Sequence, residues 1–89
     1  MDIYQKSYNK HVRLAREAAK GLTTLARAEA IYFYFSDNTD HPHPRWTYEE
    51  MMKNRLSDHQ FPIDLLRDMA DLTARNEMHA VDKAEKNQS

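Results

Sequence analysis

Residues 3–35 read IYQKSYNKHVRLAREAAKGLTTLARAEAIYFYF, and this stretch decides the fold. It contains no proline and one glycine, Gly21. Small domains rich in β-strands need frequent turn residues, and this stretch has almost none. We therefore predict a long N-terminal helix that runs from Ile3 to Phe35.

One face of this helix is predicted to be apolar, because small and apolar residues recur at the spacings of three and four that mark one helix face. This apolar stripe consists of Tyr8, Val12, Ala15, Ala19, Leu22 and Ala26. Gly21 is its weak point, since glycine inside a helix costs about 1 kcal/mol relative to alanine. We expect a kink at Gly21. The alternative is a true break, with Thr23 capping a new helix.

The segment 31–35, IYFYF, combines β-branched and aromatic residues that would suit a strand. No second strand-like run exists to pair with it, so we expect it to be helical. Five consecutive large side chains point all the way round a helix. Some of them must therefore meet a second helix, the following loop or a partner.

The rest of the chain is predicted to form a loop and two shorter helices. Residues 36–46 contain helix-competing polar residues and two prolines, which indicates a loop. Thr47 and Glu50 form a capping-box pattern, which predicts a short helix through about Leu56. We expect Trp46 at the start of this helix to pack near its first turn.

Pro62 suits the first turn of a third helix, which we expect to fray near Val81. The apolar stripe of this helix is predicted to consist of Leu65 or Leu66, Met69, Leu72 and Ala80. The predicted fold is therefore all-α: a small three-helix bundle in which one long N-terminal helix packs against two shorter helices. Residues 1–81 would form a single helical domain, and residues 82–89 a flexible C-terminal tail.

The composition fits one globular domain. The chain has 89 residues, of which 40% are hydrophobic and 30% charged, and it has no cysteine. The lack of cysteine excludes disulfides and thiolate chemistry. No apolar run approaches the ~20 residues that span a bilayer, and the N-terminus lacks the order of a signal peptide. We expect a cytoplasmic protein with no membrane partner.

Charge is unevenly shared along the chain. Residues 1–29 carry six basic and three acidic residues, a net charge of +3, whereas the remainder carries seven basic and eleven acidic residues, a net charge of −4. One explanation is an intramolecular fit between oppositely charged helices, and the other is a basic binding face. The basic row on the first helix consists of Lys6, Lys10, Arg13, Lys20 and Arg27, and Glu17 interrupts it.

The sequence contains no pattern typical of an enzyme. It has no glycine-rich phosphate loop, nucleophile elbow or helical zinc-protease motif. His41 and His43 flank Pro42, and with the nearby aspartates they could chelate a divalent metal. No other histidine or cysteine lies in that loop to complete a four-ligand site. We therefore expect a rigid connector there, and no metal, cofactor or catalytic residue.

The aromatic residues indicate a binding surface instead, because rings beside an arginine are typical of protein-binding hot spots. We expect a small non-catalytic interaction protein that binds a larger protein or nucleoprotein complex and modulates it. Small helical proteins of this kind are typical of phage and prophage products that inhibit host machinery, such as a CRISPR-type defence complex. The alternatives are a nucleic-acid-binding regulator that uses the basic face of the first helix, and a homodimer. The predicted partner-binding residues are Tyr32, Tyr34, Phe35, Arg45, Trp46, Tyr48, Lys6, Lys10, Arg13 and Arg16.

Overall fold

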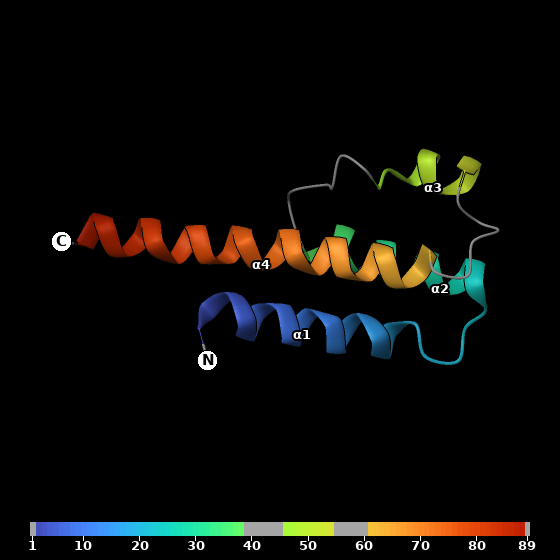
Figure 1. Cartoon of the computed structure of the whole chain (residues 1–89), viewed down its shortest axis with the longest axis horizontal. Helices are drawn as coiled ribbons and strands as arrows, with labels where there is room; N and C mark the ends of the chain where they lie inside the picture. The colour runs from blue at the N-terminus through green and yellow to red at the C-terminus, as the bar shows by residue number, and fades with distance from the viewer. Residues whose placement is uncertain (1, 39–45, 55–60, 89) are drawn as a thin grey trace.

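The protein is a bundle of helices, as the sequence predicted. The computed structural model describes residues 2–38, 46–54 and 61–88, and these contain four helices (Figure 1). The helices are α1 (Ile3–Ala18), α2 (Thr24–Asn38), α3 (Tyr48–Asn54) and α4 (Phe61–Gln88). α1 and α2 both pack on α4 and on each other. In Figure 1, α1 and α4 run side by side in opposite directions along a molecule of 50 × 23 × 19 Å.

The prediction of one long N-terminal helix is wrong, because the chain breaks at Gly21. α1 ends at Ala18, and the amide of Ala19 closes its last turn on the carbonyl of Ala15 at 3.1 Å. Gly21 then adopts a positive φ of 79°, which an L-residue rarely adopts and which cannot continue a right-handed helix. α2 starts directly afterwards, with the amide of Arg27 bonded to the carbonyl of Thr23 at 2.6 Å. The break that the sequence left as an alternative is therefore the observed arrangement.

Two helix starts carry the side-chain caps that their sequences favour. The carboxylate of Asp2 accepts a hydrogen bond from the amide of Gln5 at 2.7 Å and caps α1. The hydroxyl of Thr47 accepts one from the amide of Glu50 at 3.1 Å and caps α3, which confirms the predicted N-cap. The described part of α3 ends at Asn54, so the predicted end near Leu56 lies outside the described residues.

α4 starts where the sequence predicted but ends later. Pro62 is the second residue of the helix, in the first turn that proline tolerates. The helix then continues past Val81 to Gln88, so the predicted end near Val81 is wrong. Residues 82–88 are polar but contain no glycine or proline, so no residue in this segment breaks the helix. The flexibility of residues 82–89 stays a prediction.

The core lies where α1, α2 and the first half of α4 meet, and Trp46 and Met51, at the start of α3, also contribute to it. α1 contributes small alanines, which let it approach α4 closely, whereas α2 and α3 contribute the large side chains of Phe35 and Met51. The buried cluster consists of Ala15, Ala19, Ala28, Ile31, Phe35, Trp46, Met51, Leu65, Leu66, Met69 and Ala70. Burial of this apolar surface is the main source of stability in so small a domain.

Candidate functional site

The aromatic residues predicted to bind a partner divide into buried and accessible rings. Phe35 and Trp46 lie in the core, with only 0% and 2% of their surface exposed. They are therefore part of the fold and offer no surface to a partner in this structure. Tyr32 and Tyr34 are half-buried, and Tyr48 is exposed. Arg45, the arginine expected beside these rings, lies outside the described residues.

Trp46 is buried because its polar atom has a partner. The indole nitrogen donates a hydrogen bond to Oδ2 of Asp68 on α4 at 2.7 Å. A buried tryptophan needs such an acceptor for its N–H group. Met51, one turn into α3, is fully buried in the same core cluster. These two side chains hold the start of α3 against the bundle.

Three rings on α2 and α3 form one aromatic patch on the surface. Tyr32, Phe33 and Tyr48 lie in mutual contact, and each of the three pairs has its ring centroids 5.8 Å apart. Phe33 is 47% exposed and Tyr48 is 40% exposed. We refer to these three residues as the aromatic triad. Phe33 was not among the predicted binding residues, because the sequence does not show which of the consecutive rings in residues 31–35 faces outward.

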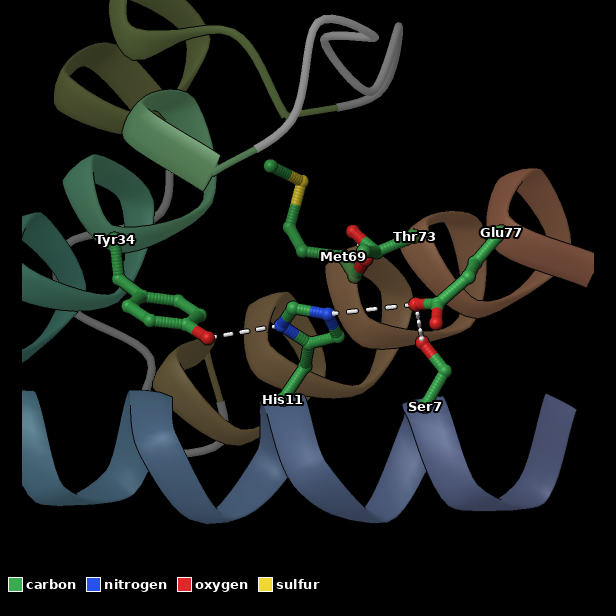
Figure 2. Close-up of polar contacts among 6 residues, drawn as sticks. All are labelled: Ser7, His11, Tyr34, Met69, Thr73 and Glu77. Carbon is green, nitrogen blue, oxygen red and sulfur yellow. Dashed lines mark hydrogen bonds and ion pairs between the residues drawn. The ribbon is translucent and has the colours of Figure 1, made fainter. Parts of the chain in front are cut away.

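A second cluster of functional groups lies between α1, α2 and α4, and it is polar (Figure 2). Nδ1 of His11 and the phenol oxygen of Tyr34 share a hydrogen bond of 2.8 Å, and Nε2 of His11 lies 4.0 Å from Oε2 of Glu77. The hydroxyl of Ser7 donates to the same carboxylate oxygen at 2.7 Å. Ser7 and His11 are both buried, with 3% and 8% of their surface exposed. This polar cluster thus joins all three packed helices.

The electrostatics of the polar cluster favour a neutral histidine. Burial lowers the pKa of His11 below its ordinary value of 6.5, and the positive charge of Lys10 acts in the same direction. The carboxylate of Glu77 opposes this shift but does not outweigh it. Burial also raises the pKa of Tyr34, so its phenol stays protonated. The imidazole and the phenol are therefore held as a neutral hydrogen-bonded pair.

The hydrogen bonds of the polar cluster join side chains of neighbouring helices. In nucleophilic catalysis by serine, the hydroxyl bonds to the imidazole, which serves as its base. Here the hydroxyl of Ser7 donates to Glu77, and Nδ1 of His11 is bonded to Tyr34. The hydroxyl of Thr73, also shown in Figure 2, bonds the carbonyl of Met69 within α4. We infer that the polar cluster fixes how α1 and α2 sit on α4.

A further polar contact extends the α1–α4 interface toward the N-terminus. The phenol of Tyr4 donates a hydrogen bond to Asp71, which raises the pKa of that phenol. Nε of Arg75 lies 3.2 Å from the same carboxylate, and the ring of Tyr4 stacks on Tyr8. Tyr4 thus serves the packing of α1 on α4.

The basic residues of the first predicted helix separate into two groups. Lys6, Lys10 and Arg13 are exposed on α1. The break at Gly21 removes Arg27 from their row and places it on α2. Arg27 instead lies with Arg16 and Lys20 around a pocket at the turn between α1 and α2. The sequence could not show this grouping, because it follows from the break.

Neither a metal site nor a membrane-spanning helix is present in the described ranges. Within residues 2–38, 46–54 and 61–88, no three histidine, cysteine or acidic side chains are placed to hold a metal ion. His41 and His43 lie outside these ranges. None of the helices in the described part of the chain is both long and apolar enough to cross a bilayer. No family model, curated protein or solved structure matches this chain.

Proposed function

We propose that this chain is a small interaction protein that docks on a larger protein or nucleoprotein complex and modulates it by occupying a surface. The observation that supports this proposal is the aromatic triad. Its rings belong to residue types that contribute strongly to protein–protein binding, and they are grouped rather than scattered. A contact of this kind needs no catalytic residue, because it acts by blocking access to the partner.

The triad is also held in place before any partner binds. Tyr48 lies directly after the N-cap of α3, and Trp46 and Met51 hold this helix against the core. Tyr32 and Phe33 lie on α2, next to the buried Ile31. A rigid patch loses little conformational freedom on binding, which favours affinity. The exposed Lys6, Lys10, Arg13 and Arg16 would add electrostatic steering toward an acidic partner. Of the other aromatic residues predicted to bind a partner, Phe35 and Trp46 lie in the core, and Tyr34 bonds to His11.

An inhibitor encoded by a phage or prophage, acting on a host complex such as a CRISPR-type defence complex, is the biological setting that we propose. A chain of this size, with one docking patch and a helical scaffold, suits steric inhibition. A cytoplasmic location follows from that setting. The second candidate is a nucleic-acid-binding regulator that uses Lys6, Lys10 and Arg13, which are exposed on one helix. Phosphate contacts of this kind would weaken steeply with added salt.

Affinity capture from the native host tests both proposals. The tagged wild-type protein is compared with the double variant Phe33→Ala, Tyr48→Ala, with and without nuclease, and partners are identified by mass spectrometry. Leu25→Ala is the matched control, since Leu25 is also an exposed apolar residue of α2, at 40% exposure, but is outside the triad. We expect a stoichiometric protein partner that survives nuclease, is lost with the double variant and is kept by the control.

Two outcomes would contradict the docking proposal. Equal capture by the wild type and the double variant would exclude the aromatic triad as the binding surface. Loss of every protein partner on nuclease treatment, with nucleic acid recovered, would favour the regulator. In that case Lys10→Glu with Arg13→Glu should abolish binding.

A further inference from the structure

A pocket of about 480 Å³ lies at the turn between α1 and α2, where both helices meet the start of α4. Its inner wall is apolar and belongs to the core: Ala19 from the end of α1, Ile31 from α2 and Leu66 from α4 are all buried. Ile63 and the exposed Leu22 extend this apolar lining outward. The volume falls within the range of about 300–1,000 Å³ typical of small-molecule sites. None of the pocket residues belongs to the aromatic triad.

Among the described residues that line the pocket, every charged or polar side chain is basic. Arg16, Lys20 and Arg27 are exposed and contribute to the pocket from three places: the last turn of α1, the turn itself and the first turn of α2. The described residues that line the pocket include no aspartate or glutamate. No ion pair joins these three cations to a carboxylate of the described residues. The pocket therefore combines an apolar interior with a positively charged rim.

The fold makes this combination because of Gly21. In a continuous helix, Arg16, Lys20 and Arg27 would lie along one rod, and no turn would enclose a cavity. Gly21, with its positive φ, lies in the turn that separates α1 from α2, and Arg16, Lys20 and Arg27 line one pocket around this turn. The apolar residues of the turn then face the first turns of α4, around Pro62.

We propose that this pocket binds a small amphiphilic anion, that is, a carboxylate attached to an aliphatic body. Burial of the aliphatic part against Ile31 and Leu66 would supply most of the affinity. The binding free energy gained in this way is proportional to the apolar area removed from water. The carboxylate would lie at the rim, where an arginine can bind both of its oxygens at once. A neutral apolar molecule would leave the three cations without a counter-charge, and a nucleic-acid backbone would leave the apolar wall unused.

Matched probes test the chemistry of the pocket. Sodium decanoate, kept below its micelle-forming concentration, is titrated into the whole isotope-labelled protein, and the methyl signals of Ile31, Ile63 and Leu66 are followed by NMR. We expect decanoate to shift these signals with saturation. Sodium acetate has the charge without the chain and should leave them in place. Decyltrimethylammonium has the chain with the opposite charge and should bind at least about fivefold more weakly, because it meets three like charges.

Matched variants test the rim. The triple variant Arg16→Gln, Lys20→Gln, Arg27→Gln removes the three rim cations. The control Lys6→Gln, Lys10→Gln, Arg13→Gln removes the same charge from exposed positions of α1 that do not line the pocket. We expect the Kd for decanoate to rise at least about fivefold in the first variant, since each exposed ion pair contributes modestly, and to stay within about twofold in the control. Circular dichroism confirms that both variants remain folded.

Three results would overturn the proposal: no saturable shift with decanoate, equal binding of decanoate and decyltrimethylammonium, or equal weakening in the two triple variants. A peptide of alternating leucine and glutamate is the last probe. If it bound the pocket while decanoate did not, the site would serve an acidic segment of a protein, and the proposal of a free small molecule would fail. Because every probe is a defined molecule, none of these results depends on whether the aromatic triad has a partner.

Discussion

α1 and α2 both pack on α4, but they do so with different chemistry. The buried residues of α1 begin with Ser7 and His11, which bond to partners on other helices, and only then comes Ala15, with the buried Ala19 directly after the end of the helix. The buried residues of α2 are apolar throughout: Ala28, Ile31 and Phe35. Apolar burial is non-directional and stabilises any close approach, whereas a hydrogen bond requires one particular partner. We infer that α2 supplies more of the stability and that α1 fixes the register.

The largest expected loss of stability comes from removing Phe35, the fully buried ring of α2. Phe35→Ala should destabilise the fold by about 3–5 kcal/mol, because it leaves a cavity at a fully buried ring. That loss is a large part of the stability of a domain this small. Phe33→Ala is the control, since Phe33 lies two positions away and is 47% exposed, and it should cost only about 1 kcal/mol, because it loses its ring contacts with Tyr32 and Tyr48 but leaves no core cavity. Urea unfolding measures both, and equal losses would contradict the assigned core.

A substitution at Gly21, in the turn between α1 and α2, should have a smaller effect on stability. Gly21→Ala should cost about 1–2 kcal/mol, because an L-residue is strained at a φ of 79°. The cost is conformational, since a Cβ atom at this position would meet no atom within 4 Å. Gly21→Asn should cost less, because asparagine tolerates the left-handed region. If Gly21→Ala instead stabilised the protein in thermal unfolding, α1 and α2 would form the continuous helix that the apolar spacing first suggested.

The sequence predicted best those features that depend on neighbours in the chain. Thr47 as an N-cap and Pro62 in a first helical turn are local preferences, and both were correct. The helical state of residues 31–35 was also correct, because no partner strand existed. The sequence favours a kink over a break at Gly21, because the apolar spacing continues unchanged from Ala19 through Leu22. In the structure this regular spacing does not mark a buried helix face, because Leu22 is 44% exposed.

The buried face of α1 could not be predicted from apolar residues alone. The predicted stripe passed through Tyr8 and Val12, which are only partly buried, whereas the buried positions are Ser7 and His11. These side chains can be buried because Glu77 and Tyr34 provide hydrogen bonds, and such partners are distant in sequence. The available signal in the sequence is the spacing of four that joins Ser7 to His11 and His11 to Ala15.

The same reasoning applies to the candidate binding residues. The run of large residues at 31–35 is unusual in the sequence, but the roles of its rings depend on tertiary contacts. Trp46 is buried because Asp68 accepts its N–H group, while Tyr48, two residues later, faces outward. The basic pocket required the break at Gly21, so a sequence interpretation based on one long helix could not contain it.

The smallest expected effect on stability comes from His11 in the polar cluster. It appears only as a change of the free energy of unfolding with pH. The pKa of His11 is lowered in the folded protein, chiefly by burial and then by Lys10, while Glu77 opposes the shift. The unfolded chain therefore binds this proton more readily than the folded one, so the free energy of unfolding falls as protons are added. The contribution of His11 is complete above its ordinary pKa of 6.5 and is lost as the pH falls from 6.5 toward the lowered value.

Comparison with His11→Gln isolates this contribution, because glutamine can keep a hydrogen bond to Tyr34 but does not titrate. Urea unfolding at pH 7.5, 6.5 and 5.5 should show the wild type losing more stability than the variant across the lower interval, and the two changing in parallel across the upper one. The other histidines are present in both proteins and cancel in the difference. If the wild type instead gained stability relative to the variant as the pH fell, Glu77 would have formed an ion pair with a protonated His11. The contact of α1 with α4 would then include a charged pair. The difference between the polar packing of α1 and the apolar packing of α2 would be larger than a neutral cluster implies.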